Sequence, residues 1–221
     1  HGDLVQAPDG GWVMVLLGMR TRGKTRSFSS LGRETFATNI TWVDGWPVAE
    51  PVHPSDLVPA PEFVEEFANG DFNAEFIAIR RLPSSVAEIK NGAMHIRGEG
   101  ASMSDLCPAF VGRRLRRHNG IVRADLSVNG IGGISIRYDE VSHYDIEVSS
   151  RKIIARSSVS RVVHEVESKF YADANTTLYM EFVPAENKFS IDGQSCDFIR
   201  LGFIDNSGNK QQVAEFDGRF L

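Results

Sequence analysis

Short runs of alternating apolar and polar residues, separated by dipeptides that favour tight turns, constrain the fold of this chain more than any other feature. Alternation at a period of two is typical of a half-buried β-strand. A glycine preceded by asparagine or aspartate supplies the positive φ angles that two-residue hairpin turns need. No long helical period accompanies these runs, so the sequence predicts an all-β protein built from antiparallel hairpins. The turn dipeptides are Asp44-Gly45, Asn91-Gly92, Asn129-Gly130 and Asp192-Gly193.

The part of the chain after Pro61 contains about ten or more such strand candidates. Clear examples are His143–Val148, Thr177–Phe182 and Ile199–Ile204. So many short strands with turns between them predict an antiparallel two-sheet sandwich of the jelly-roll type. A segment of this length buries enough apolar surface to fold independently.

The first segment, from His1 to about Pro51, offers four strand candidates. One four-stranded sheet cannot bury both of its faces, whereas in a β-propeller the neighbouring blades cover them. We therefore expect this segment to be one propeller blade whose companion blades are missing from the chain. The continuous apolar run Trp12–Leu17 is typical of a strand buried on both faces. The other candidates are Leu4–Gln6, Phe36–Val43 and Trp46–Val48.

A proline-rich stretch from Pro47 to Pro61 predicts an extended linker, because proline lacks the N–H that a strand ladder requires. We place the domain boundary near Pro59. The expected domains are a last propeller blade plus linker over residues 1–58 and a C-terminal β-sandwich over residues 59–221.

Composition and charge exclude several function classes. The net charge of −5 gives no sign of a surface for nucleic acid or membrane, and no apolar run approaches the length of a membrane span. The N-terminus shows no signal peptide, so a cytoplasmic location is favoured. Cys107 and Cys196 lack the spacing of a zinc site, which leaves a buried reduced pair or one disulfide.

Two motifs in the first segment carry a family resemblance. Leu31–Thr35 has the sequence Leu-Gly-Arg-Glu-Thr, and Trp42–Pro47 has the sequence Trp-Val-Asp-Gly-Trp-Pro. With His-Gly-Asp at the opening His1–Asp3, this stretch resembles the last blade of the five-bladed propeller in glycoside hydrolase family 43. The β-xylosidases and α-L-arabinofuranosidases of that family are the best match.

The second segment resembles the concanavalin-A-like jelly roll that many of these β-xylosidases carry at their C-terminus. The likeness rests on Leu106–Arg114 with its paired arginines, on Phe198–Asp205, and on Ser207-Gly208 followed by Ala214–Asp217. The order of blade, linker and sandwich matches the C-terminal half of the family. The resemblance therefore covers nearly the whole chain.

An inverting exo-glycosidase acting on xylo-oligosaccharides or arabinosides is what the resemblance implies for the parent enzyme. Such catalysis needs an acid and a base across the glycosidic bond, and the family uses a further aspartate. The resemblance places all three carboxyl groups upstream of His1. We expect no catalytic residue in this chain, with Asp3 and Glu34 in structural roles, and we expect the chain alone to be inactive without its upstream blades.

Three residues map onto binding roles in the family. Arg33 is implied to hydrogen-bond the hydroxyls of the terminal sugar, and an ion pair with Glu34 or a neighbouring blade is the structural alternative. His1 is implied to contact a central Ca²⁺ of the parent propeller, or water bound to it. Phe198 is implied to close one side of the substrate pocket, although phenylalanine in a strand usually belongs to the core. The chain itself requires no cofactor.

Two polar segments have simpler interpretations. On a strand, the basic run Arg113–His118 would spread its charge over both faces, which favours salt bridges with carboxylates over a polyanion site. Asp205–Asn209 offers oxygen ligands without the glycine and glutamate positions of an EF-hand, which favours a turn over a calcium site.

Two other roles stay open for the sandwich. As a carbohydrate-binding module it would stack sugars on tyrosines, because tryptophan is absent after Trp46. The candidate tyrosines are Tyr138, Tyr144, Tyr171 and Tyr179. As a structural domain it would brace the propeller and form the interface of a homo-oligomer.

Overall fold

The computed structural model of the chain describes residues 2–20, 29–52, 62–171, 175–183 and 197–220. Within these ranges the regular structure is almost entirely β-strand, with two short 3-10 helices, η1 (Pro83–Ser85) and η2 (Gly218–Phe220). The prediction of an all-β protein is confirmed. The chain divides into two compact units, one ending at Glu65 and the other continuing from Glu66, and each is described by itself.

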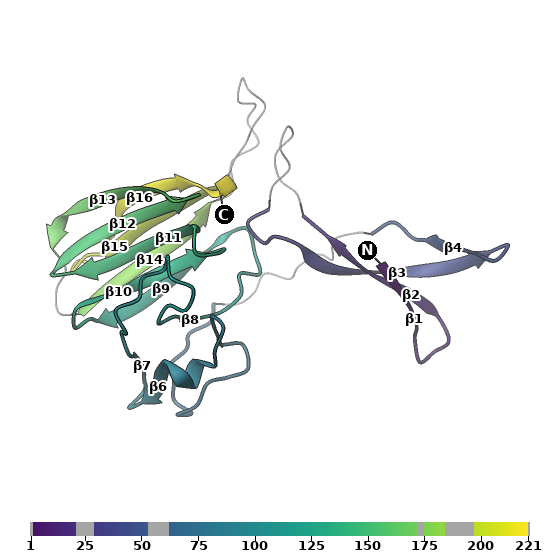
Figure 1. The fold of residues 1–221 in the computed structure, drawn as a ribbon, viewed down its shortest axis with the longest axis horizontal. Coiled ribbons are helices and arrows are strands. Elements are labelled where there is room, and N and C mark those ends of the chain that lie inside the picture. The colour runs from purple at the N-terminus through teal and green to yellow at the C-terminus, as the bar shows by residue number, and fades with distance from the viewer. Residues whose placement is uncertain (1, 21–28, 53–61, 172–174, 184–196, 221) are drawn as a thin grey trace, which may run out of the picture. The chain divides into compact units, whose positions relative to one another are not determined.

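The first unit is a four-stranded antiparallel meander, the form of a propeller blade (Figure 1). This sheet, called the blade below, pairs its strands in chain order. The predicted hairpin at Asp44-Gly45 is confirmed, since the φ angles of 50° and 81° are both positive, as a type I′ turn requires. The strands are β1 (Gly2–Gln6), β2 (Trp12–Gly18), β3 (Glu34–Val43) and β4 (Trp46–Ala49).

Strand β2 is less buried than its sequence predicts. The run Trp12–Leu17 indicates burial on both faces, but its side chains are mostly half-buried and Leu17 is 46% exposed. The reason is that β1 and β3 flank β2 within the sheet, while the described residues of this unit form no second layer over it. Trp42 and Trp46 are 43% and 76% exposed. Exposed apolar surface of this kind usually marks an interface.

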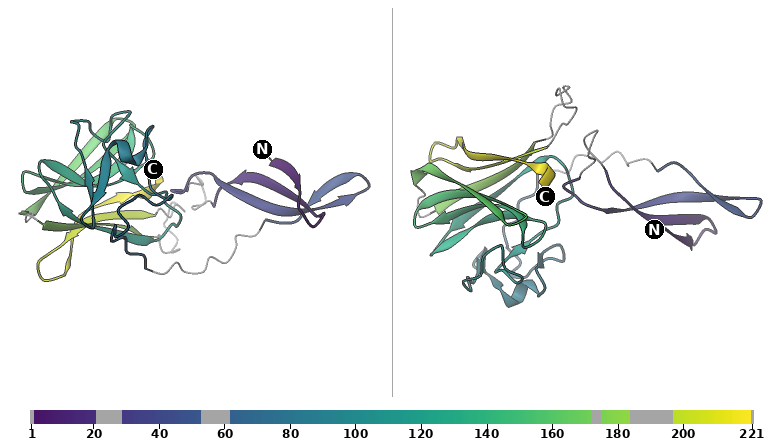
Figure 2. Two further views of the ribbon diagram at one scale, coloured as in Figure 1. Left: turned by 90° about the horizontal axis from the view of Figure 1, so that it is seen from below. Right: turned by 45° about the horizontal axis from the view of Figure 1, so that its top comes forward.

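The second unit contains a sandwich of two four-stranded antiparallel sheets, seen as separate layers in Figure 2. This confirms the predicted two-sheet architecture. The first sheet has the order β10-β11-β12-β13, with β10 (Ile131–Arg137), β11 (Ser142–Ser149), β12 (Lys152–Val159) and β13 (Val162–Tyr171). The second has the order β16-β15-β14-β9, with β9 (Gly120–Ser127), β14 (Asn175–Val183), β15 (Phe198–Ile204) and β16 (Lys210–Asp217).

The main core lies between these two sheets because successive strand residues point to opposite faces. Tyr144 and Ile146 of β11 meet Leu178 of β14 and Leu201 of β15, and none of the four is more than 1% exposed. Burial of one such side chain contributes about 1.5–3 kcal/mol. The sandwich therefore has an internal source of stability that the blade lacks.

Two hairpin turns of the first sheet share the sequence Ser-Arg. Ser150-Arg151 links β11 to β12, and Ser160-Arg161 links β12 to β13. All four residues have positive φ angles, between 49° and 72°. These are I′-like turns made without glycine or asparagine, so the sequence carries no usual signal for them.

Asn129-Gly130 does not form the hairpin that the sequence predicts. Strand β9, before it, pairs with β14, and strand β10, after it, pairs with β11. Gly130 has a positive φ of 106° but Asn129 does not have one. Because a type I′ hairpin needs both, the dipeptide instead carries the chain from one sheet to the other.

A small annex, residues 66–119, precedes the sandwich in the second unit. Its hairpin of β6 (Ala87–Lys90) and β7 (Ala93–Ile96) turns at Asn91-Gly92 with φ angles of 54° and 72°, as predicted. A second pair joins β5 (Ile77–Ala78) to β8 (Val111–Gly112). Val86, Ala87 and Val111 form a separate small core.

The basic run Arg113–His118 is not a strand. Glu75 forms ion pairs with both Arg113 and Arg116. Two residues three positions apart on a strand point to opposite faces, so one carboxylate reaches both only because the run is irregular. The predicted salt bridges with carboxylates are confirmed, while the strand prediction is wrong beyond β8.

Cys107 is an exposed free thiol, so the expectation of a buried or disulfide-bonded cysteine is wrong for this residue. Cys196, Asp192-Gly193 and the predicted boundary near Pro59 lie outside the described residues. In the part of the chain that is described, no helix has the length and apolar character needed to span a membrane.

Candidate functional site

A glycine turn presents Arg33 at the entry to β3. Gly32 has a φ of +66°, which favours glycine, and its N–H donates to the carbonyl of Ser29 at 3.0 Å. The side chain of Arg33 is exposed. Among the described residues, no hydrogen bond or ion pair engages it. Its guanidinium is free to donate to a ligand.

Glu34, the next residue, is held by a different arginine. Arg20 donates from Nε to Glu34 Oε2 at 2.9 Å and from an Nη atom to Oε1 at 2.7 Å. This paired hydrogen bond raises the pKa of Arg20 above its ordinary value. The ion pair between Arg33 and Glu34, offered by the sequence as a structural alternative, does not form. Arg33 is left available while its neighbour is neutralised.

Phe198 is the first residue of β15 and lies between Val183 of β14 and Asp217 of β16. The next residue, Ile199, is 1% exposed and points into the sandwich core. Strand alternation directs Phe198 to the opposite, outer face, where it is half-buried. The structural alternative of a core phenylalanine is therefore not what the sandwich shows.

His1, the residue implied to contact calcium, lies outside the described residues. Across the described ranges, no group of three or more histidine, cysteine, aspartate or glutamate side chains is arranged to hold a metal ion.

Asp205–Asn209 forms the predicted turn. Asp205 Oδ1 accepts from the N–H groups of Ser207 and Asn209, each at 2.9 Å, and Oδ2 accepts from the Gln211 side chain at 2.7 Å. These donors, with the Asn209 N–H first, hold the pKa of Asp205 below its ordinary value. The carboxylate is occupied by the turn itself.

The tyrosines proposed for sugar stacking are mostly hidden. Tyr144 and Tyr179 are 1% and 2% exposed, so neither can present a ring face to a sugar. Tyr138 is 72% exposed, and the Tyr171 side chain lies outside the described residues. A flat aromatic platform, the usual means of carbohydrate stacking, is absent from the described tyrosines.

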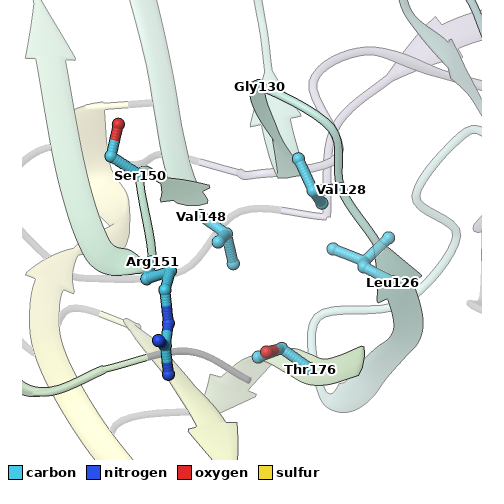
Figure 3. Close-up of a pocket in the computed structure, with 7 residues that line it drawn as sticks. All are labelled: Leu126, Val128, Gly130, Val148, Ser150, Arg151 and Thr176. Carbon is cyan, nitrogen blue, oxygen red and sulfur yellow. The ribbon is translucent and has the colours of Figure 1, made fainter. Parts of the chain in front are cut away.

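The sandwich has a cavity of about 590 Å³ at one end (Figure 3). Side chains from both sheets line it, and none of the candidate site residues Arg33, Phe198 and His1 is among them. It lies where β14 begins, whereas Phe198 is paired with Val183 at the end of β14. The lining residues are Leu126, Val128, Gly130, Val148, Ser150, Arg151 and Thr176.

His143, a buried histidine of β11, was not identified from the sequence as a candidate functional residue. His143 is 1% exposed and contacts both Ser104 and Asp145. The available signal was the spacing of His143 and Asp145, two residues apart on an alternating run, which places them on one face. Their contact with Ser104 depends on how the annex packs, and no local pattern reports it.

Comparison with known proteins agrees with this architecture. Residues 64–221 match the family described as the β-xylosidase C-terminal concanavalin A-like domain. The chain is 32% identical over 175 residues to a non-reducing end α-L-arabinofuranosidase, BoGH43B, of Bacteroides ovatus, covering 68% of this chain and 32% of that protein. It is 50% identical over 52 residues, 23% of this chain and 9% of the relative, to a xylosidase/arabinosidase of Butyrivibrio fibrisolvens.

Solved structures show the same fold at low identity. The GH43 protein BlXynB of Bacillus licheniformis has a TM-score of 0.75 and 16% identity, with 99% of this chain and 45% of that one covered. A xylan β-1,4-xylosidase of Bacillus halodurans has a TM-score of 0.73 and 16% identity, with 100% and 46% covered. The chain spans about a third of the arabinofuranosidase and less than half of each structure.

These findings define an all-β protein of the concanavalin-A-like sandwich class. The matched segment includes the whole sandwich and the whole annex. The chain belongs to the family of β-xylosidase C-terminal concanavalin A-like domains of glycoside hydrolase family 43.

Proposed function

We propose that this chain is the C-terminal part of a longer, inverting exo-glycosidase that hydrolyses xylo-oligosaccharides or arabinosides. Family membership and the activities for which the relatives are named, those of an arabinofuranosidase and a xylosidase/arabinosidase, support this assignment. The catalytic carboxylates lie on propeller blades upstream of His1. In this proposal residues 1–58 supply a blade and linker, and residues 59–221 supply the sandwich.

The proposal rests mainly on the side chain of Arg33, which is exposed and, within the described part of the chain, unpaired. Its guanidinium is exposed and unengaged among the described residues, while the adjacent Glu34 is occupied by Arg20. A planar, permanently charged fork with several N–H donors suits the fixed hydroxyls of a terminal sugar and nearby carboxylates. The turn at Gly32 fixes the backbone from which the side chain projects.

Phe198 and His1 complete the proposed site of the parent enzyme. Phe198, half-buried on the outer face of β15, closes one side of the pocket. His1 contacts the central Ca²⁺ or its water. The sandwich also braces the propeller and supplies the interface of a homo-oligomer. Because the acid and base are upstream, the chain alone does not turn over glycosides.

The test uses the full-length enzyme with 4-nitrophenyl β-xyloside and 4-nitrophenyl α-L-arabinofuranoside. Loss of charge-assisted hydrogen bonds costs about 1.5–3 kcal/mol, so Arg33→Ala lowers kcat/KM by about ten- to a hundredfold. Arg97→Ala is the matched control, since Arg97 is likewise exposed and its side chain makes no hydrogen bond or ion pair among the described residues. This control keeps the wild-type kcat/KM.

Wild-type kcat/KM in the Arg33→Ala enzyme would contradict the sugar-binding role. Turnover of either glycoside by the 221-residue chain alone would contradict the placement of the catalytic carboxylates.

A further inference from the structure

Ser104, His143 and Asp145 are joined by hydrogen bonds in the order hydroxyl, imidazole, carboxylate. Ser104 Oγ lies 3.0 Å from His143 Nε2, and His143 Nδ1 lies 2.7 Å from Asp145 Oδ2. Because Asp145 can only accept, Nδ1 carries the proton and Nε2 is left to accept from the serine hydroxyl. This is the arrangement by which a histidine activates a serine.

The histidine and the carboxylate are held rigidly on β11. Both lie on the outer face of the first sheet, opposite the core side chain of Tyr144, yet they are only 1% and 3% exposed. Ser135 of β10 donates to Asp145 Oδ1 at 2.6 Å, and Arg156 of β12 has an Nη atom 3.8 Å from Asp145 Oδ2. A base fixed by a second partner keeps its orientation toward the serine.

The annex turn Ser102–Asp105, called the Ser104 turn below, presents the hydroxyl. Asp105 Oδ2 accepts from both the N–H and the hydroxyl of Ser102, at 2.7 and 2.9 Å, which closes the turn. Arg137 of β10 donates to the carbonyls of Met103 and Asp105, at 3.1 and 3.2 Å. These contacts anchor the turn on both sides of Ser104, while Ser104 itself stays exposed.

We propose that Ser104, His143 and Asp145 form an acyl-transfer centre that accepts esters of small carboxylic acids. Ser104 Oγ attacks the ester carbonyl while its proton passes to His143 Nε2. The Oγ–acyl bond forms, the bond to the alkoxy group breaks, and His143 returns the proton to the leaving alcohol. Water then hydrolyses the acyl-serine by the same route and restores the hydroxyl.

The structure also indicates how the turn is held and which substrates fit. Arg137 donates to the carbonyls on both sides of Ser104 and also lies 3.6 Å from Glu140, so it positions the turn. The Ser104 hydroxyl lies on an exposed turn. Ser104 is not among the residues that line the cavity shown in Figure 3. A small acyl group, such as acetyl, therefore suits this centre.

The test treats the 221-residue chain with a fluorophosphonate probe and with 4-nitrophenyl acetate, and maps the adduct by mass spectrometry. We expect the adduct on Ser104, and we expect Ser104→Ala to abolish it. A general base contributes about 10²–10⁴-fold, so His143→Gln slows labelling at least about a hundredfold. Ser207→Ala, at an exposed turn serine with no histidine contact, labels as wild type does.

An unlabelled Ser104 in the wild-type chain would overturn the proposal, whether or not the His143 variant folds. Equal labelling in a folded His143→Gln chain, checked by circular dichroism, would also overturn it and leave the three residues as a clasp for the Ser104 turn. The outcome is separate from glycosidase activity, because the chain alone is expected to leave glycosides intact.

Discussion

The blade and the sandwich use the same unit, a four-stranded antiparallel sheet, and differ in what covers it. In the sandwich each sheet is the other's second layer, and Leu201 and Ile146 are fully buried. In the blade most large apolar side chains remain half-buried or exposed, as Leu17 and Trp46 are, although Ile40 of β3 is buried. Hydrogen-bonded strands define a sheet, but a second layer is what makes it independent.

Separating the two regions tests this contrast most strongly. The sandwich with its annex, residues 66–221, has its own core and is expected to unfold cooperatively when expressed alone. Residues 1–65 have no such core among their described residues and are expected to lack a cooperative transition. Thermal unfolding followed by far-ultraviolet circular dichroism distinguishes the two. A sharp transition in the isolated first unit would break the comparison.

Leucine-to-alanine substitutions in the two regions sharpen the comparison between the blade and the sandwich. Leu201→Ala removes a fully buried side chain and is expected to lower the free energy of unfolding by about 2–5 kcal/mol. Leu17→Ala, at a position 46% exposed in β2, is expected to cost less than about 1 kcal/mol. Urea denaturation of the full chain measures both. Equal losses would mean that the blade is as well packed as the sandwich.

The smallest expected effect concerns the turn at Asp205. Its depressed pKa means that the carboxylate stabilises the folded state above the pKa of the unfolded chain, about 4. This contribution disappears as the pH falls through the lower, folded-state pKa. The Asp205→Asn chain is therefore expected to be less stable than wild type at pH 7 and equal to it near pH 2. A stability difference that stays constant with pH would contradict the role of the charge.

Most strands of both regions could be predicted from alternation, because burial of one sheet face imposes it locally. Partner choice could not: Asn129-Gly130 has the composition of a hairpin, yet its flanking strands pair in different sheets. The turns at Ser150-Arg151 and Ser160-Arg161 were missed because their residues rarely adopt positive φ angles. In each case the surrounding sheet overrides the local preference.

The candidate site divides in the same way. The position of Arg33 at the entry to β3 could be predicted from its motif. The ion pair between Arg20 and Glu34 could not, because these residues are 14 positions apart in the sequence. The outward direction of Phe198 follows from the burial of Ile199, which only the sandwich reveals. The burial of His143 depends on the annex, and no periodicity in β11 reports it.

The passage of the chain from one sheet to the other at Gly130 sets an order of events during folding. Strand β9 emerges from the ribosome first but pairs only with β14, and the whole β10–β13 sheet is synthesised between them. The β10–β13 sheet pairs quickly because its contacts are local, while β9 remains an unpaired edge strand until β14 is made. A nascent chain halted before residue 175 would thus expose this strand to aggregation or to a chaperone.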